Sequence, residues 1–474
     1  MTAKLKALPL LMSALFATSS GFAVADTTGA DHAAAQDKAR MIVLTDIGNE
    51  PDDSQSFVRL LTYSNEFEIE KLIATTSTWQ RDKVQPALLK ERVDAYAKVY
   101  NNLKAHADGF PTPQSLQDKI ISGRAGFGMD VVGDGQSSEA SRSIIDIVDK
   151  ADARPVWITL WGGGVDLAQA LWDVKKNRSE QDVAKFVSKI RVYSISDQDN
   201  TGAWMRRNFP TMTWISSLHG FNDYWLSTWI GISAPIAEGG DMSQVNNEWL
   251  HKHIQQGPLG EKYPDIMYIM EGDSPSFMYL LKNGLNVPEH PEYGSWGGRY
   301  ASVAYDDEGG LRTSVSDTVQ SVDGKEYRNA SASIWRFRHQ FQNDFAGRMQ
   351  WTLTDNYQDA NHNPVLTLNG QAGLAPVELS VKAGDKVELS AAGSQDPDGD
   401  KLAYRWWQYG EPTAHALQIH FAPKVELTDS DKMTASFVAP KVDKPTPFHI
   451  ILEVSDDGEP QLYSYRRAIV TVNP

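Results

Sequence analysis

The sequence contains no cysteine among its 474 residues. This absence excludes disulfide bonds, metal sites built from thiolates, and catalysis by a cysteine nucleophile. The chain is longer than one ordinary domain, so two domains are expected, and each would be large enough to bury a core.

Basic residues are scarce relative to acidic ones. The chain has 45 lysines and arginines against 61 aspartates and glutamates, which gives a formal net charge of −16 at pH 7. Binding to the phosphates of nucleic acids needs the opposite surplus, so nucleic acid is not an expected partner. A Gly-x-Ser-x-Gly motif is also missing, and Gly162-Gly163-Gly164 lacks the lysine that a phosphate-binding loop needs.

Apolar runs long enough to cross a membrane are missing too. The run at Ala7–Ala17 is shorter, but it follows Lys4 and Lys6 and precedes the small residues Ala23-Val24-Ala25. This three-part pattern predicts a signal peptide over residues 1–25, cleaved after Ala25; a buried N-terminal helix is the alternative. Cleavage would leave a net charge of −18 on a protein that is expected to be secreted or periplasmic.

After a flexible leader at residues 26–39, two patterns of hydrophobicity divide the chain. In residues 40–358, short apolar runs alternate with helical periodicity, which predicts a Rossmann-like α/β domain with a mostly parallel sheet and flanking helices. The expected strands are Met41–Thr45, Ile69–Thr76, Pro155–Trp161, Ile190–Ser196, Met212–Ser216 and Ile266–Met270. The expected helices are Ser54–Ser64, Lys83–Tyr100 and Asp166–Lys176.

In residues 365–474 the pattern changes to short alternating strands separated by turn residues, without helical periodicity of useful length. This predicts a C-terminal all-β sandwich. Trp406 and Trp407 would then place one ring on each face of a sheet, so that one is buried and the other is exposed to a ligand.

Carboxylates gather where the first expected strand ends. Asp46, Glu50, Asp52 and Asp53 follow it within eight residues, and the basic residue next downstream is Arg59. A polar turn with a helix N-cap would explain Asp53, but not this density of like charges. Because adjacent carboxylates repel unless a cation joins them, we expect a hard divalent cation, and calcium suits an exported protein.

Other expected strands end in oxygen-rich segments as well. Ile266–Met270 leads into Glu271 and Asp273, and Ile190–Ser196 leads into Asp197, Gln198, Asp199 and Asn200. The carboxyl ends of parallel strands lie at one edge of a sheet, where ligands bind, so these side chains are expected to approach Asp46. For residues 197–200 a solvated loop is an equal alternative.

The segment from Thr45 to Asp53 resembles the N-terminal signature of the inosine–uridine-type nucleoside hydrolases. More broadly, residues 41–356 resemble the nucleoside-hydrolase-like domain of bacterial cellulose-binding proteins, and the C-terminal sandwich resembles the one that accompanies it. The sequence segments that carry this resemblance are Leu44–Gly48, Pro51–Asp53, Ser196–Asp199, Met270–Ser276 and Pro291–Tyr300. The turn at Ser394–Asp400 resembles those of immunoglobulin-like modules of the polycystic-kidney-disease and cadherin types.

The resemblance implies one Ca²⁺ held by Asp46, Asp53, Asp273 and the main-chain carbonyl of Val165. Asp46 would also accept the proton of the attacking water, and Asp52 would contact a sugar hydroxyl and assist as a base. The implied chemistry is attack of a deprotonated water on an oxocarbenium-like sugar carbon.

Several residues depart from the nucleoside hydrolase pattern. Leu44 stands in place of an acidic residue, and Asp166 and Thr78 stand in place of asparagines. Gly272 occupies the position where one class has a histidine that protonates the nucleobase, and Glu271 is the nearest substitute acid. The residues implied to bind the metal are retained, and those implied to recognise a purine base are not. The expected substrate is therefore a glycoside rather than a nucleoside.

Three functions follow from this pattern. The first is an exported calcium-dependent glycosyl hydrolase, the second a non-catalytic cellulose-binding or other carbohydrate-binding protein with a dormant site, and the third a true nucleoside hydrolase. The oligomeric state is not predicted. The expected substrate-binding residues are Asp52, Trp79, Asp197, Asp199, Asn200, Trp204, Glu271 and Trp296, although most tryptophans pack in cores.

A second calcium site is suggested in the sandwich. Asp396, Asp398 and Asp400 have the alternating spacing that suits calcium ligands. A simple type I turn rich in aspartate and glycine explains the same residues equally well.

Overall fold

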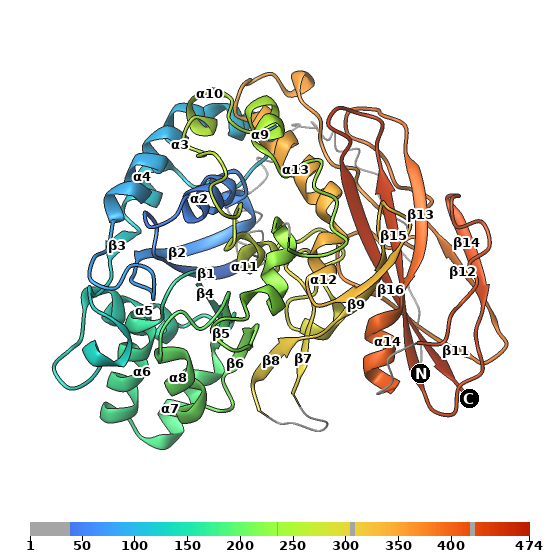
Figure 1. The fold of residues 1–474 in the computed structure, drawn as a ribbon. Coiled ribbons are helices and arrows are strands. Elements are labelled where there is room, and N and C mark those ends of the chain that lie inside the picture. Colours follow the sequence, from blue (N-terminus) through green and yellow to red (C-terminus); the bar gives the residue numbers. More distant parts are fainter. Residues whose placement is uncertain (1–37, 235, 304–308, 418–421) are drawn as a thin grey trace, which may run out of the picture. The chain divides into compact units, whose positions relative to one another are not determined.

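The computed structural model describes residues 38–234, 236–303, 309–417 and 422–474 (Figure 1). The predicted signal peptide and residues 26–37 of the leader lie outside the described residues. From Ala39 to Pro474 the chain forms one compact unit. None of the described helices is long and apolar enough to span a membrane.

An eight-stranded sheet forms the first part of this unit, with the strand order β3-β2-β1-β4-β5-β6-β8-β7. All neighbouring strands are parallel except β7 and β8, so the predicted mostly parallel sheet is confirmed. The strands are β1 (Ala39–Thr45), β2 (Phe67–Ala74), β3 (Ile120–Ser122), β4 (Val156–Leu160), β5 (Ile190–Ser194), β6 (Thr213–Ser216), β7 (Tyr300–Ser302) and β8 (Leu311–Ser314).

The central strand β1 is apolar on both faces because helices cover both faces of the sheet (Figure 1). Met41 and Val43 pack in one core with α2, α3, α11 and α13, while Ile42 and Leu44 pack in the other with α5 to α8. The helices are α2 (Asp52–Thr62), α3 (Pro86–His106), α4 (Pro113–Gln117), α5 (Glu139–Asp149), α6 (Val165–Asn177), α7 (Glu180–Ser188), α8 (Thr201–Asn208), α9 (Asn247–His253), α10 (Gly257–Gly260), α11 (Ser274–Met278), α12 (Ala332–Trp335) and α13 (Arg338–Trp351).

The segment Ile266–Met270 is not a strand, so that prediction is wrong. Met267 and Tyr268 are 64% and 73% exposed, and the main chain of Met270 is held by the Ser233 hydroxyl at 2.7 and 3.0 Å. The apolar run predicts a buried strand, but of its five residues Met270 alone is fully buried. The far edge of the sheet is formed by β7 and β8 instead, and the hairpin of β9 (Asp317–Gln320) and β10 (Glu326–Asn329) follows.

The C-terminal part is the predicted β-sandwich. One sheet has the order β11-β16-β15-β13, with β11 and β16 parallel and the other pairs antiparallel, and β12 pairs with β14 in the second sheet. The strands are β11 (Val377–Lys382), β12 (Lys386–Ser390), β13 (Ala403–Tyr409), β14 (Thr434–Val438), β15 (Thr446–Ser455) and β16 (Tyr463–Asn473). Contrary to expectation a helix, α14 (Gly410–Leu417), follows β13.

The two neighbouring tryptophans of β13 do point to opposite faces. Trp406 is 3% exposed in the sandwich core, where its indole N–H donates to the Lys432 carbonyl oxygen at 2.9 Å. Trp407 packs against Phe337, with the ring centroids 6.2 Å apart, and beneath the Arg336 guanidinium. The expectation that the second ring is free for a ligand is therefore wrong, because it packs against side chains that precede α13.

Candidate functional site

A cavity of about 370 Å³ opens beyond the carboxyl ends of β1 and β4. Its lining divides into an acidic group and an aromatic group. The acidic residues are Asp46, Glu50, Asp52, Asp53 and Asp273. The aromatic residues are Trp79, Trp161, Tyr224, Trp229 and Tyr268.

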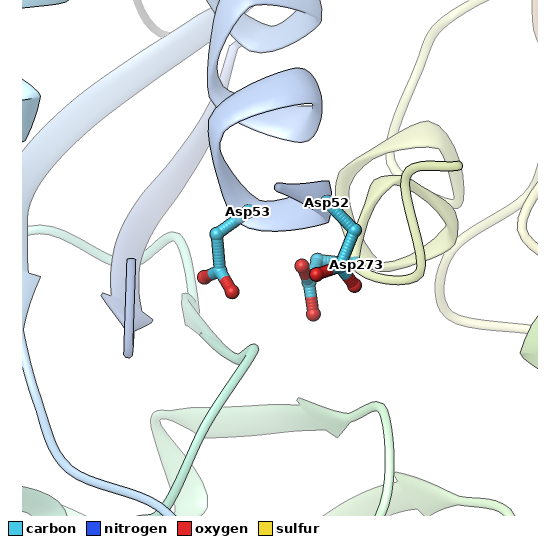
Figure 2. Close-up of side chains that lie close together, drawn as sticks. All are labelled: Asp52, Asp53 and Asp273. Atoms are coloured by element: carbon cyan, nitrogen blue, oxygen red, sulfur yellow. The ribbon is translucent and has the colours of Figure 1, made fainter. Parts of the chain in front are cut away.

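The fold brings the acidic residues together from two places in the sequence. Asp52 and Asp53 begin α2, and Asp273 directly precedes α11. One carboxylate oxygen from each of these three residues lies within 4.8 Å of the others, and Figure 2 shows the side chains converging. Asp46 follows β1 and lines the same cavity outside this group of three.

The electrostatics of the cavity are unfavourable without a cation. Burial raises the pKa of Asp46 to about 6 and the pKa of Asp52 to about 7, and the charges of Asp46 and Glu50 add to the shift at Asp52. Burial, followed by repulsion from the neighbouring carboxylates, holds the pKa of Asp53 and of Asp273 well above the usual range. Within the described part of the chain, no lysine or arginine forms an ion pair with these four aspartates.

The residues present fit the calcium ion that the resemblance implies. Asp273 is 2% exposed, and its Oδ2 atom is buried without a hydrogen-bond partner. Closely spaced carboxylate oxygens with an unpaired, desolvated member are the ligands that a hard divalent cation takes. Asp53 is oriented by a hydrogen bond from the Thr45 hydroxyl.

Two glycines make room for the carboxylates. A Cβ atom on Gly162, in the turn after β4, would lie 2.7 Å from Asp46 Oδ1. A Cβ atom on Gly272 would lie 2.8 Å from Asp52 Oδ2 and 3.3 Å from the Trp229 ring. Gly272 is where one class of nucleoside hydrolases carries histidine, so the space of that side chain is taken here by Asp52 and Trp229.

Glu271 does not reach the cavity, so its prediction as a substrate-binding residue is wrong. It is fully buried in an ion pair with Arg59 at 2.6 Å, and it accepts hydrogen bonds from the hydroxyls of Tyr263 at 2.5 Å and Ser274 at 2.8 Å. Its backbone φ of +56° turns the chain so that Asp273, rather than Glu271, lines the cavity.

The oxygen-rich segment after β5 contributes a residue that is not among the predicted substrate-binding residues. Asp197 pairs with Arg206 at 2.6 Å, Asp199 accepts from the Thr201 amide at 2.8 Å, and Asn200 accepts from the Met129 amide at 2.8 Å. None of the three lines the cavity, whereas Gln198 does. Its side-chain amide donates to the Trp161 carbonyl oxygen at 2.7 Å, and its own Oε1 atom is buried without a partner.

Of the three tryptophans predicted to contact a sugar, one lines the cavity. Trp79 is 51% exposed there. Trp204 instead stacks on Trp172, with ring centroids 5.8 Å apart. Trp296 is 2% exposed, packed between Phe341 and Tyr465, so its predicted role is wrong.

Tyr224 and Trp229, which are not among the predicted substrate-binding residues, complete the aromatic wall. The Tyr224 ring lies 6.4 Å from the ring of Trp79 and 6.2 Å from that of Trp229, and Phe221, which is not a lining residue, packs on Trp79 at 6.1 Å. The signal available was the aromatic density of residues 221–229. The Tyr224 hydroxyl, like Gln198 Oε1, is buried without a hydrogen-bond partner.

Val165 is the first residue of α6 and is fully buried, and its side chain does not line the cavity. The neighbouring Asp166 accepts hydrogen bonds from the Ser138 hydroxyl at 2.6 Å and the Arg124 amide at 3.1 Å. Asp166 therefore fixes the turn after β4 to α5, and a metal-ligand role for the Val165 carbonyl stays a prediction.

Comparison with known proteins places this geometry in a family. Residues 40–300 match the family described as "Cellulose-binding Sde182, nucleoside hydrolase-like domain", and residues 386–472 match "Cellulose-binding protein Sde0182, C-terminal domain". A nucleoside hydrolase-related protein from Saccharophagus degradans, associated with carbohydrate metabolism, is 36% identical with a TM-score of 0.78. That likeness covers 92% of this chain and 100% of the other.

More distant structures include the type III effector protein XopQ, complexed with adenosine diphosphate ribose. It is 8% identical, with a TM-score of 0.32 over 70% of this chain and 100% of that chain. No curated protein matches the sequence.

Proposed function

Because this chain belongs to the family of cellulose-binding proteins with a nucleoside hydrolase-like domain, we propose that its cavity is a calcium-dependent carbohydrate site that hydrolyses glycosidic bonds. One observation carries the proposal. Three buried aspartates and the half-buried Asp52, none with a basic partner among the described residues, line the same 370 Å³ space as a row of aromatic rings. A cation satisfies the first group, and the apolar face of a sugar satisfies the second.

The acidic wall supplies the proposed metal and base. Asp52, Asp53 and Asp273 would hold the ion through the oxygens that already lie within 4.8 Å. When bound, calcium makes a water molecule more acidic. Asp46, on the same cavity and with its pKa raised to about 6 by burial, is mostly ionised at pH 7 and is suited to accept a proton from water.

The aromatic wall supplies the proposed sugar contacts. Trp79 and Tyr224 offer ring faces for stacking, and they lie beside two polar atoms that lack partners, Gln198 Oε1 and the Tyr224 hydroxyl. Leaving buried polar atoms unpaired costs about 1–3 kcal/mol each, and sugar hydroxyls would relieve that cost. Carbohydrate is the ligand class that satisfies rings and polar atoms together.

The leaving group is proposed to be a sugar rather than a nucleobase. No histidine is among the described residues that line the cavity, and the nearest extra acid, Glu271, is bound to Arg59. Besides the proposed base Asp46, Glu50 is the carboxyl group that lines the cavity outside the group of Asp52, Asp53 and Asp273, and we assign it the protonation of a glycosidic oxygen. Export, as the N-terminal segment predicts, would bring the site to both calcium and polysaccharide.

The test is hydrolysis of a panel of aryl glycosides and cello-oligosaccharides, in calcium and in chelator. We expect turnover that needs calcium and that falls by at least about a hundredfold in Asp46→Asn, since a general base contributes that much or more. The matched control is Asp197→Asn, which removes a carboxylate paired with Arg206 outside the cavity. Calcium binding without turnover of any glycoside would contradict the hydrolase proposal, and rapid cleavage of inosine or uridine would redirect it to nucleosides.

A non-catalytic carbohydrate-binding role is the second candidate. The buried ion pair of Glu271 with Arg59 favours this binding role, because Glu271 cannot deliver a proton to a bound glycoside from there. Retention on insoluble cellulose separates the two roles. A pure binder would be retained equally with and without Asp46→Asn and would release no soluble sugar over a long incubation.

A further inference from the structure

A second group of carboxylates lies at one edge of the sandwich, outside the cavity. It is formed by the loop 396–400 before β13, the turn 456–458 after β15, and Asn361 and His362, which lead into the sandwich. Hydrogen bonds tie these segments together. The Lys401 amide donates to Asp457 at 2.8 Å, and the His362 amide donates to Asp398 at 2.8 Å.

The middle aspartate of the 396–400 loop already has a partner. Both oxygens of Asp398 lie 3.0–3.1 Å from His362 Nδ1. The His362 ring in turn stacks on Tyr357, with ring centroids 3.7 Å apart, and its other nitrogen lies 3.1 Å from His106 Nδ1. Asp398 therefore holds the connecting segment and is not available as the metal ligand that the sequence spacing suggests.

Asp396 and Asp456 each leave one oxygen unused. Asp396 Oδ1 accepts from the amides of Asp398 at 2.8 Å and Asp400 at 3.1 Å, and Asp456 Oδ1 accepts from the amides of Leu462 at 2.9 Å and Gly458 at 3.1 Å. The Oδ2 atoms of both are buried without a partner, and Asp456 as a whole is 1% exposed.

Asp400 completes the group from the other end of the loop. A Cβ atom on Gly458 would lie 2.6 Å from Asp400 Oδ2, so this carboxylate packs directly on the 456–458 turn. Among the ion pairs of the described residues, none joins a lysine or arginine to Asp396, Asp400 or Asp456. Burial raises the pKa of Asp456 to about 6, and the charge of Asp396 adds to that shift.

We infer that Asp396, Asp400 and Asp456 form a second calcium site, which links the two sandwich loops beside the segment that enters the sandwich. Two buried carboxylate oxygens without hydrogen-bond partners indicate a positively charged ligand that oxygen atoms coordinate. These carboxylates are spread more widely than the group of Asp52, Asp53 and Asp273, so the ion would complete its shell with main-chain carbonyls and water.

The site is expected to be structural, because the segments that form it contribute no residue to the lining of the cavity. Calcium there would hold the turn between β15 and β16 against the loop before β13. The same turn is tied to the connecting segment by Asn361, whose side-chain amide donates to the Pro460 carbonyl oxygen at 2.9 Å. Calcium binding is therefore expected to stabilise both the sandwich and the segment that connects it to the α/β part of the chain.

The experiment is calcium titration of the full chain by calorimetry after removal of bound metal. We expect two ions per wild-type chain, one in Asp456→Asn, one in Asp273→Asn and none in the double variant. Asp431→Asn, which removes an exposed sandwich carboxylate paired with Lys432, should still bind two. Two ions in Asp456→Asn would overturn the inference, and loss of every ion in Asp273→Asn alone would do so as well. One ion in the wild type and in Asp273→Asn, with none in Asp456→Asn, would instead refute calcium binding in the cavity and support the sandwich site.

Terbium luminescence provides a readout that does not depend on the buried Asp456 being replaced. The Tyr357 ring lies beside this site, stacked on His362, and should sensitise terbium bound there. In the Asp273→Asn background, which removes the ion beside the tryptophans of the cavity, we expect calcium-reversible emission that falls at least tenfold when Asp400→Asn is added, a change on a partly exposed loop that the fold should tolerate. Unchanged emission in this variant, with its circular dichroism spectrum also unchanged, would overturn the inference.

Discussion

Asp273 has one carboxylate oxygen that is buried and has no hydrogen-bond partner, and Asp53 and Asp52 crowd the same space. Replacing this residue should therefore change the response of the protein to calcium. In Asp273→Asn, the rise in melting temperature on adding calcium should shrink to the part that the sandwich site contributes, because the cavity ion loses a charged ligand. In chelator at pH 7.5 the variant should melt no lower than the wild type, since one repelling charge is gone.

Differential scanning fluorimetry with and without calcium checks this prediction. At a calcium concentration of a hundred times the dissociation constant, binding at the cavity alone should add about 2.7 kcal/mol to the free energy of unfolding of the wild type. An equal calcium response in Asp273→Asn and in the wild type would contradict the assignment.

Trp79 and Trp225 are a matched pair of exposed rings, at 51% and 53% exposure, of which the first lines the cavity and the second does not. Trp79→Ala should lower the affinity for cello-oligosaccharides by about tenfold to a hundredfold, as expected when an aromatic ring loses about 1.5–3 kcal/mol of burial. Trp225→Ala should leave the affinity within twofold. Calorimetric titration measures both, and equal losses would show that the cavity wall is not the binding surface.

At the scale of elements, a buried ion pair joins α2 to the segment before α11. Arg59 and Glu271 are both fully buried and 2.6 Å apart, and Arg59 also lies 4.2 Å above the Phe345 ring. Glu271→Gln should lower the free energy of unfolding by about 3–5 kcal/mol, because it leaves a buried guanidinium without its counter-charge. Asp197→Asn, which breaks a partly exposed pair with Arg206, should cost about 1 kcal/mol or less.

Urea denaturation of the two variants measures this difference. The result also bears on the role of Glu271 in chemistry. If Glu271→Gln kept its stability but lost turnover, Glu271 would be an acid of the site after all, and its description as a structural residue would be wrong.

The sequence predicted those elements whose pattern follows from local burial. The apolar run of β1 and the carboxylates after it follow from a strand buried on both faces and a ligand site at its carboxyl end, so Asp46, Asp52 and Asp53 were found. Asp273 was found for a partly wrong reason, since a loop and not a strand carries it to the cavity.

Other residues could not be placed because their surroundings are set by distant parts of the chain. Nothing next to Trp296 in the sequence shows that Phe341 and Tyr465 enclose it. Likewise, Arg59 is 212 residues from Glu271, so the ion pair that removes Glu271 from the cavity has no local signal. Gln198 is not among the predicted substrate-binding residues because its charged neighbours are the more obvious ligands, although those neighbours bond to the following helix α8.

At the scale of the whole molecule, the buried aspartates predict how stability depends on pH when metal is absent. The pKa values of Asp46 and Asp52 are raised from an ordinary value near 3.8 to about 6 and about 7 in the folded protein. The folded state thus holds more protons than the unfolded state between about pH 4 and pH 7, so stability falls as pH rises through this window.

We therefore expect the melting temperature in chelator to fall between pH 5 and pH 8, and calcium to reverse most of that fall. Asp52→Asn should flatten the profile in chelator, because it removes one of the groups whose ionisation is opposed. Melting temperatures recorded across the window, with and without calcium, check the prediction. A profile in chelator that rises with pH would contradict the unfavourable ionisation of these aspartates.

The central claim is that calcium and carbohydrate share the cavity between the acidic and aromatic walls. The most direct measurement is calorimetric titration of cello-oligosaccharide into the full chain, in calcium and in chelator, for the wild type and for Asp273→Asn. We expect binding to the wild type in calcium to be at least tenfold tighter than in chelator, and Asp273→Asn to bind equally weakly in both. Wild-type binding of equal strength with and without calcium would contradict it.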